Sequence, residues 1–190
     1  MADEAKERLT ISTVGHSTRP IEEFIDLLRG YGVRQLVDVR TIPRSRHNPQ
    51  FNRENLAASL EAAGIVYRHM PGLGGLRHPR RDSINMGWRN SSFRGYADYM
   101  QTPEFRENIE ELIAFSSEAP TAIMCAEAVP WRCHRSLIAD ALVVRGVEVR
   151  EILTASKAQS HVLTPFARVE GTQVTYPGDG NNLELRFDGS

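Results

Sequence analysis

The sequence predicts an α/β fold: a three-layer sandwich around a mostly parallel sheet of about five strands, Rossmann-like or flavodoxin-like. Stretches typical of strands alternate along the chain with stretches of helical period, which is the pattern of strand–helix–strand units. The expected strands at residues 35–39 and 121–125 are apolar without strict alternation, as in a parallel sheet covered on both faces. The strand order does not follow from these patterns.

The first half of the chain supplies three strands and two helices. Residues 10–14 are a β-branched run that favours a strand. Pro20 suits the first position of a helix, and Gly30 ends the apolar period that follows. The other elements expected here are a strand at 35–39, a proline-containing loop at 40–52, a helix at 53–63 and a strand at 65–69.

In the second half, residues 70–95 form a long stretch rich in glycine and proline, and loops of this length inside a compact domain are usually functional. The remaining expected elements are helices at 96–100, 103–115 and 130–145 and strands at 121–125 and 147–153. We therefore expect one α/β domain at residues 1–153. Residues 154–190 are expected to be a partly irregular C-terminal extension, in which residues 162–177 could form a small hairpin.

The composition is that of a globular protein. Of 190 residues, 41% are hydrophobic and 25% are charged, which argues against global disorder. No apolar run is long enough to span a membrane, and residues 1–10 lack the apolar core of a signal peptide. Cys125 and Cys133 are the two cysteines, which excludes a disulfide scaffold. We expect a cytoplasmic protein with reduced thiols and no membrane partner.

The net charge of -1 hides an uneven distribution. Lys6 and Lys157 are the only lysines among 23 basic residues, and ten arginines face three acidic residues between Arg40 and Arg94. Genomic base composition can explain arginines at surface positions. The local excess, however, creates a positive field that can gather phosphate or another anion.

Chemically useful side chains follow four of the expected strands. In open α/β sheets, ligands bind beyond the carboxyl ends of the strands, so these residues are expected to meet at one edge. They are His16, Ser17 and Arg19 after the first strand, Asp38, Arg40, Arg44, Arg46 and His47 at or after the second, His69 at the end of the third, and Cys125, Glu127, Arg132, Cys133, His134 and Arg135 at or after the fourth.

The two thiols are candidates for nucleophilic or redox chemistry. Cys133 is expected in the first turn of a helix, where the helix dipole and nearby cations favour a thiolate. Each thiol also has a structural explanation: Cys125 could be a small buried hydrophobe, and Cys133 could pack opposite Leu137. The expected catalytic set comprises the nucleophile Cys133 or Cys125, the proton carrier His16 or His134, and Glu127 or Asp38 as base or orienting carboxylate.

The basic loops suit a phosphate-bearing ligand, because guanidinium groups bind phosphate through two hydrogen bonds. The expected anion-binding residues are Arg40, Arg44, Arg46, His47, Arg77, Arg132, Arg135 and Ser17. The arginines could instead pair with Asp38, Glu127 and Asp140. Trp88, Phe93, Tyr96 and Tyr99 offer rings on which a base could stack, or they form a core beneath the long loop.

Several familiar sites are missing from the sequence. Arg132 follows Cys125 by seven positions with no intervening glycine, which does not fit the cysteine–arginine phosphate loop of thiol phosphatases. Neither phosphate-binding glycine motif is present. Paired C-x-x-C spacings are also missing, although Cys125, Cys133 and His134 could still gather round a metal with His16 or His47.

Six short motifs in this order resemble the domain-of-unknown-function 488 (DUF488) family. They are the segments 14–18 (VGHST), 37–40 (VDVR), 43–45 (PRS), 74–77 (GGLR), 124–127 (MCAE) and 133–135 (CHR). The resemblance covers about residues 9–153, and residues 165–168 also look like longer members. It implies an α/β sandwich domain with no settled reaction. The family's motif residues correspond here to His16, Ser17, Asp38, Arg40, Pro43, Cys125, Glu127, Cys133, His134 and Arg135.

Three functional hypotheses follow. The first is an enzyme that uses Cys and His chemistry on an anionic, nucleotide-like or nucleic-acid substrate. The second is a non-catalytic nucleic-acid- or nucleotide-binding module with structural thiols. The third is a metal-dependent enzyme with Cys and His ligands. We favour the first, because a simple binding module needs no such constellation of Cys, His, Glu and Asp. Substrate, cofactor and oligomeric state stay open.

Overall fold

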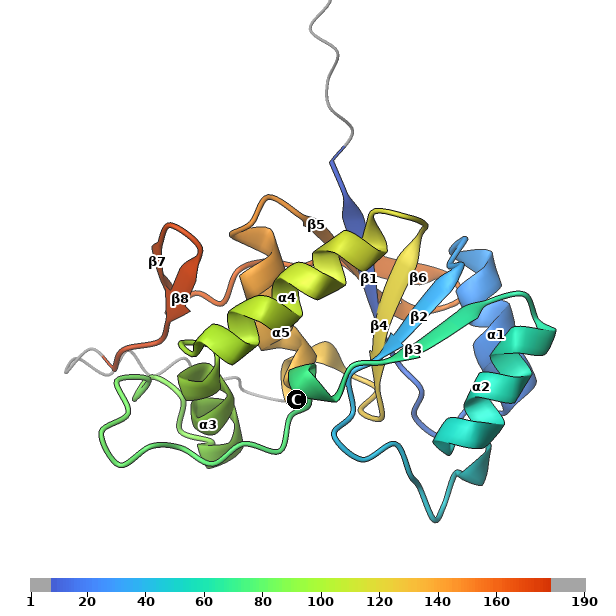
Figure 1. Cartoon of the computed structure of the whole chain (residues 1–190), viewed down its shortest axis with the longest axis horizontal. Coiled ribbons are helices and arrows are strands. Elements are labelled where there is room, and N and C mark those ends of the chain that lie inside the picture. The colour runs from blue at the N-terminus through green and yellow to red at the C-terminus, as the bar shows by residue number, and fades with distance from the viewer. Residues whose placement is uncertain (1–7, 179–190) are drawn as a thin grey trace, which may run out of the picture.

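The computed structural model describes residues 8–178, and it confirms the three-layer α/β sandwich (Figure 1). Its strands are β1 (Thr10–Gly15), β2 (Gln35–Asp38), β3 (Val66–His69), β4 (Thr121–Cys125), β5 (Glu148–Thr154), β6 (Lys157–Ser160), β7 (Arg168–Glu170) and β8 (Gln173–Thr175). Its α-helices are α1 (Ile21–Gly30), α2 (Arg53–Ala62), α3 (Ser91–Tyr99), α4 (Pro103–Ser116) and α5 (Arg135–Val143). Short 3-10 helices occupy Pro49–Phe51, Pro71–Leu73 and Pro130–Arg132.

The central sheet has six strands in the order β3-β2-β4-β1-β5-β6. The first five strands are parallel, and β6 is antiparallel to β5. Strand β4 lies between β2 and β1, whereas the Rossmann order places β1 beside β2. The register pairs Gly15 with Cys125 and Asp38 with Met124. The carboxyl ends of β1, β2 and β4 therefore meet at one edge.

Each face of the sheet carries its own hydrophobic core. Helices α1 and α2 cover one face, and α3, α4 and α5 cover the other (Figure 1). Neighbouring residues of a strand point to opposite faces, so Met124 packs with α1 and α2, whereas Ile123 and Cys125 pack with α5. This alternation decides which polar side chains can meet at the sheet edge.

Two helices begin elsewhere than expected. Helix α3 starts at Ser91, because the side chain of Asn90 accepts hydrogen bonds from the first free backbone N–H groups. Helix α5 starts at Arg135 instead of residue 130: the preceding residues form a 3-10 turn, and Cys133 has an extended backbone (φ -131°, ψ 147°). Cys133 thus lies just before the helix, outside its first turn.

The chain after β5 adds one strand to the central sheet and forms a separate two-stranded sheet. Strand β6 widens the sheet from the expected five strands to six, and β7 and β8 form an antiparallel pair. Val174 and Tyr176 are buried against the core under α5. Within residues 8–178, no helix is both long and apolar enough to cross a membrane.

Candidate functional site

The two thiols and Arg135 form one buried cluster on the α5 side of the sheet, which we call the thiol cluster. Cys125 ends β4, Cys133 lies two residues before the start of α5, and Arg135 is the first residue of that helix. Arg135 donates its Nε–H to Cys125 Sγ at 2.9 Å and its backbone N–H to Cys133 Sγ at 3.5 Å. The start of α5 therefore holds both sulfur atoms with one residue.

The guanidinium of Arg135 is buried without a carboxylate partner. It is 1% exposed, and its other acceptors are neutral: Thr13 Oγ1 at 3.2 Å and the Glu127 carbonyl oxygen at 2.6 Å. None of the ion pairs between residues 8 and 178 includes it. Because an unpaired buried charge is costly, the arginine favours a negative charge on a sulfur that it contacts.

The pKa values of the two thiols are shifted in opposite directions. The nearby Cys125 side chain, together with Arg135, lowers the pKa of Cys133 to about 6. Burial raises the pKa of the Cys125 thiol well above its ordinary value. The pair titrates jointly, and its singly ionised form has Cys133 as the thiolate and Cys125 as the neutral thiol. The ionised Cys133 sulfur then carries the negative charge that Arg135 contacts.

His134 lies next to the Cys133 sulfur. Its Nδ1 is 3.5 Å from Cys133 Sγ, and its Nε2 is 3.1 Å from the carbonyl oxygen of Val39. Burial lowers the pKa of His134, so the ring is neutral, donates from Nε2 to Val39 and directs the lone pair of Nδ1 to the thiol. Gly75 allows this placement, because a Cβ there would be 2.6 Å from Nδ1.

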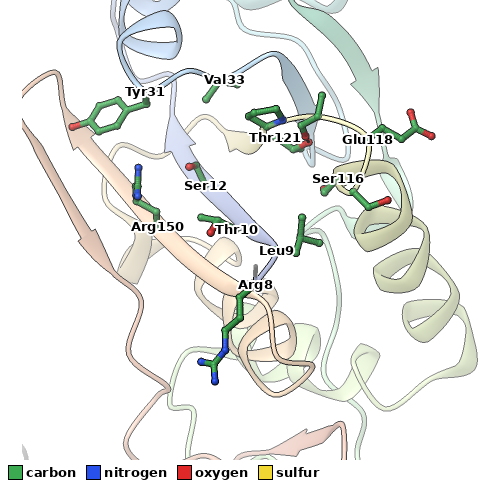
Figure 2. Close-up of a pocket in the computed structure, with 13 residues that line it drawn as sticks. Arg8, Leu9, Thr10, Ser12, Tyr31, Val33, Ser116, Glu118, Thr121 and Arg150 are labelled. Carbon is green, nitrogen blue, oxygen red and sulfur yellow. Dashed lines mark hydrogen bonds between the residues drawn. The ribbon is translucent and has the colours of Figure 1, made fainter. Parts of the chain in front are cut away.

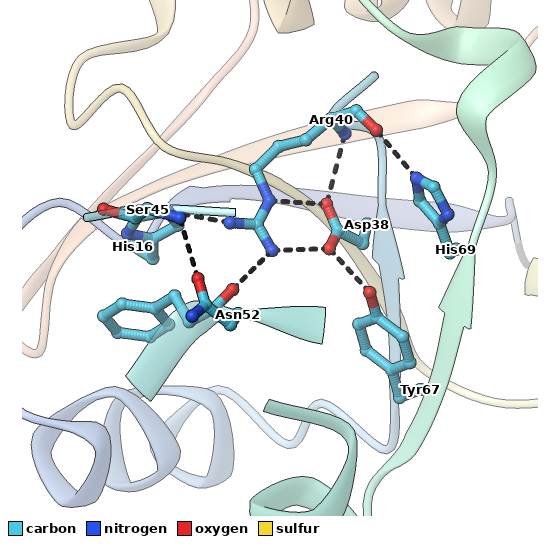
Figure 3. A network of polar contacts seen from close by, with 8 residues as sticks. His16, Asp38, Arg40, Ser45, Asn52, Tyr67 and His69 are labelled. Carbon is cyan, nitrogen blue, oxygen red and sulfur yellow. Dashed lines mark hydrogen bonds and ion pairs between the residues drawn. The ribbon is translucent and has the colours of Figure 1, made fainter. Parts of the chain in front are cut away.

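A second polar cluster surrounds the carboxylate of Asp38 (Figure 3). We call it the Asp38 cluster, and its other members are His16, Arg40 and Tyr67. Arg40 donates its Nε–H to Asp38 Oδ1 at 2.9 Å and its Nη2–H to Oδ2 at 2.7 Å. The Tyr67 hydroxyl donates to Oδ2 at 2.7 Å. Asp38 is fully buried and Arg40 is 7% exposed, so the ion pair uses the guanidinium internally and leaves little of it for a ligand.

His16 belongs to the Asp38 cluster as a neutral ring. Its Nε2 lies 3.4 Å from Nη1 of Arg40, and its Nδ1 donates to the carbonyl oxygen of Ser17 at 2.7 Å. The ring stacks on Phe51 at a centroid distance of 4.1 Å. Burial lowers the pKa of His16 to about 4. Both ring nitrogens are therefore occupied within the protein.

The two clusters lie at the same sheet edge but on opposite faces. The Asp38 cluster packs with Phe51 and the α1 and α2 core, whereas the thiol cluster packs with α5. The hydrogen bonds between the two regions involve backbone groups: the N–H of His16 donates to the carbonyl oxygen of Cys125 at 2.9 Å, and the His134 ring contacts the carbonyl oxygen of Val39 at 3.1 Å. At the first of these contacts the backbones lie so close that a Cβ on Gly15 would overlap the Glu127 carbonyl. The structure therefore brings the expected site residues together as two groups.

The remaining expected site residues lie on loops at this edge. Four cationic side chains are exposed and have no hydrogen bond or ion pair within residues 8–178, namely Arg44, Arg46, His47 and Arg132. Glu127 is exposed and contributes only its carbonyl to the thiol cluster. Ser17 has a left-handed backbone (φ 50°). Arg77 stacks over the ring of Tyr99 at 3.5 Å and is used internally.

Of the two alternatives for Trp88, Phe93, Tyr96 and Tyr99, the structure favours the second, because these rings pack in the α3 to α5 core. Tyr96 is fully buried and Tyr99 is 7% exposed, and Trp88 stacks on Phe93 at 4.9 Å. The exposed ring near the site is Trp131, in the turn between the two cysteines, with 59% of its surface exposed. Within residues 8–178, no group of three or more His, Cys, Asp or Glu side chains could hold a metal ion.

A broad hollow lies at the other end of β1 (Figure 2). It has a volume of about 610 Å³, and Thr10, Ser12 and Arg150 line it together with residues 116–121. None of the thiol cluster or Asp38 cluster residues reaches it. The clusters are therefore packed sites at the carboxyl edge, and the hollow belongs to the amino edge.

Comparison with known families shows to which protein family the chain belongs. The family described as "Domain of unknown function DUF488" matches residues 20–142. The chain belongs to the DUF488 family. No curated protein and no solved structure matches it. The range matched to DUF488 contains Asp38, Cys125, Cys133 and Arg135, whereas His16 lies just before it.

Some residues of the DUF488 site escaped sequence reasoning. Thr13 contacts Arg135, Tyr67 contacts Asp38, and Gly75 makes room for His134. Tyr67 shares a face with Asp38 because its strand pairs with β2 in parallel register. That register cannot be read from a single sequence.

Proposed function

We propose that this DUF488 chain is a thiol-dependent enzyme in which the Cys133 thiolate attacks an electrophilic centre of an anionic, phosphate-bearing substrate. The burial of Arg135 without a carboxylate partner carries this proposal, because it favours a thiolate beside it at neutral pH. A thiolate of this kind is costly to hold for packing alone. Its position also suits a ligand: the loops after β1 and β4 lead to helices on opposite faces, which is where open α/β sheets bind ligands.

Each member of the thiol cluster has a defined part in the proposal. Cys133 is the nucleophile, and Arg135 and the Cys125 thiol hold its negative charge. Because Cys133 is already a thiolate in this proposal, His134, whose Nδ1 lies 3.5 Å from Cys133 Sγ, takes up a proton and delivers it to the leaving group. Because Val39 fixes the opposite nitrogen as a donor, the ring keeps that lone pair directed at the sulfur.

The substrate class follows from the charges left free at the same edge. Arg44 and Arg46 follow β2, and Arg132 lies in the turn before Cys133; all three are exposed without partners. Arg40 and Arg135, in contrast, are satisfied internally. Partnerless guanidinium groups at the same sheet edge as a thiolate favour phosphate or phosphate ester ligands.

Alkylation of Cys133 tests the proposal. We expect iodoacetamide to label Cys133 with a rate that rises through a midpoint near pH 6, and inorganic phosphate to slow the reaction by competing for the site. Anionic iodoacetate should react faster relative to iodoacetamide than it does with a free thiol, and Arg44→Gln with Arg46→Gln should remove that preference. A midpoint near the ordinary thiol value of about 8.5 would refute the thiolate nucleophile.

A non-catalytic nucleic-acid-binding role is the second candidate. The same partnerless arginines and the exposed Trp131 ring favour it, because single-stranded nucleic acids bind through backbone charge and base stacking. It predicts that a fluorescent single-stranded oligonucleotide binds with an affinity that falls steeply with salt and survives Cys133→Ser. An oligonucleotide affinity that does not change with salt concentration would contradict this role. The described residues give no comparable support to the metal-dependent alternative.

A further inference from the structure

We propose that Cys125 is the resolving thiol of Cys133: once a hydroperoxide has oxidised Cys133, Cys125 closes an intramolecular disulfide with it. This inference deepens the proposed function, and it rests on that function only for the thiolate at Cys133. It assigns a chemical role to Cys125, which does not react in a mechanism with Cys133 as the single nucleophile.

The fold brings the two sulfur atoms together from positions eight residues apart. Cys125 ends β4, and the 3-10 turn Pro130–Arg132 returns the chain so that the backbone N–H of Cys133 donates to the carbonyl oxygen of Pro130 at 3.0 Å. Both sulfur atoms then contact Arg135, at 2.9 and 3.5 Å. Cys125 lies close enough to lower the pKa of Cys133, and its own thiol donates to the Glu127 carbonyl oxygen at 3.9 Å. A partner for oxidised Cys133 is therefore held beside it by the same arginine.

The surroundings of Cys125 and Cys133 favour a disulfide within one molecule over one between two molecules. Cys133 is 6% exposed and Cys125 is 4% exposed, so a small hydroperoxide can reach the sulfur more easily than another protein's thiol can. The chain has no third cysteine. The carbonyl of Glu127 accepts from Arg135 at 2.6 Å, which ties the connecting loop to the same guanidinium.

The chemistry balances with a hydroperoxide as the oxidant. The Cys133 thiolate attacks the terminal oxygen, the O–O bond breaks, and the departing alkoxide takes a proton from solvent to become an alcohol. The sulfur loses two electrons and becomes a sulfenic acid. The Cys125 sulfur then attacks the Cys133 sulfur, the S–O bond breaks, and hydroxide leaves with the Cys125 proton as water. A small dithiol returns both thiols and is itself oxidised to a disulfide.

The same arginine makes the disulfide easy to reduce. Arg135 stabilises the thiolate of the reduced pair, and a stabilised reduced form makes a disulfide more oxidising. In the disulfide form the buried guanidinium loses the negative charge that it contacts directly, and Glu151, which interacts with it without an ion-pair contact, is the carboxylate that still acts on it. We therefore expect a reversible bond that dithiothreitol removes quickly from the folded protein.

The experiment uses the full reduced chain with one equivalent of hydrogen peroxide. We expect a monomer lighter by two hydrogens, with a peptide that links Cys125 to Cys133 and no thiol left for iodoacetamide. Under the same conditions Cys125→Ser should accumulate sulfenic acid at Cys133, trapped by dimedone at a level about tenfold above wild type. Cys133→Ser should show neither product.

Three results would overturn the inference: sulfenic or sulfinic acid at Cys133 in wild type without a disulfide, a disulfide-linked dimer, or equal dimedone labelling in wild type and Cys125→Ser. Wild-type mapping does not depend on how well a variant folds. If Cys133 is alkylated with a midpoint near pH 6 but forms no disulfide, only the resolving role of Cys125 fails. If that midpoint is near the ordinary thiol value, the proposed function fails.

Discussion

Arg40 and Arg135 show how differently two buried arginines can be neutralised in one protein. Arg40 lies against the fully buried carboxylate of Asp38, with two hydrogen bonds to its oxygens. Arg135 contacts sulfur, hydroxyl and carbonyl groups only. The sequence predicts both as anion-binding residues, because Arg40 follows one expected strand and Arg135 lies near the start of the helix that follows another. Only the structure shows that a carboxylate satisfies one of them and a thiol pair the other.

Replacing Arg135 tests this assignment at the scale of one residue. In Arg135→Met the cation that stabilises the thiolate is gone, so the pKa of Cys133 should rise and the midpoint of its alkylation should move from near pH 6 toward the ordinary thiol value of about 8.5. The pH dependence of iodoacetamide labelling measures this. Arg132→Met is the matched control, since that exposed side chain has no partner. Equal midpoints in the two variants would contradict the role of Arg135.

At the scale of elements, a buried histidine fastens the end of β6 to the domain. His161 follows β6 and lies between Asp140 of α5 and Glu151 of β5, with its ring nitrogens 2.7 Å from an oxygen of each carboxylate. Tyr176 donates to the other oxygen of Asp140 at 2.7 Å. Burial by itself lowers the pKa of His161, but the two carboxylates overcome this effect and raise it to about 9.

This ion pair makes stability depend on pH in a defined direction. Because the folded pKa of His161 exceeds the unfolded value of about 6.5, its contribution is complete below that pH and is lost as pH rises through about 9. His161→Ala should lower the free energy of unfolding at pH 7 by about 3–5 kcal/mol, because it leaves two buried carboxylates unpaired. Urea denaturation at pH 7 and pH 10 measures both effects.

His47→Ala is the control for that experiment, since His47 is exposed and has no partner within residues 8–178. The difference between wild type and His161→Ala should shrink at pH 10. An unchanged difference would mean that packing, and not charge, holds the histidine.

The five parallel strands of the sheet were predictable from the sequence, whereas β6 and the start of α5 were not. Apolar runs such as residues 121–125 are buried on both faces, so their composition marks them clearly. The start of α5 depends on Cys133, whose extended backbone interrupts a segment of helical period. The contacts that hold it there come from Arg135 and His134. The place of His161 was equally hidden, because its partners are distant in sequence.

At the scale of the whole molecule, the sheet separates chemistry that the sequence places together. Adjacent carboxyl ends were expected to direct thiols, imidazoles and guanidinium groups into one site. The register pairs Asp38 with Met124, so Asp38 faces α1 and α2, whereas Cys125, one residue later in β4, faces α5. A shift of one residue in strand pairing exchanges the faces. The sequence could therefore predict that these residues lie at one edge of the sheet, but not which of them lie on which face.

This separation predicts that the two clusters act independently. Asp38→Asn leaves Arg40 buried without its ion pair, and the free energy of unfolding should fall by about 3–5 kcal/mol. The alkylation midpoint of Cys133 should nevertheless stay near pH 6, because the hydrogen bonds between the two regions involve backbone groups and distant sites behave additively. Urea denaturation and iodoacetamide labelling of the same samples measure both. If Asp38→Asn moved the midpoint as far as Arg135→Met does, the two faces would form one electrostatic site, and the division by the sheet would be wrong.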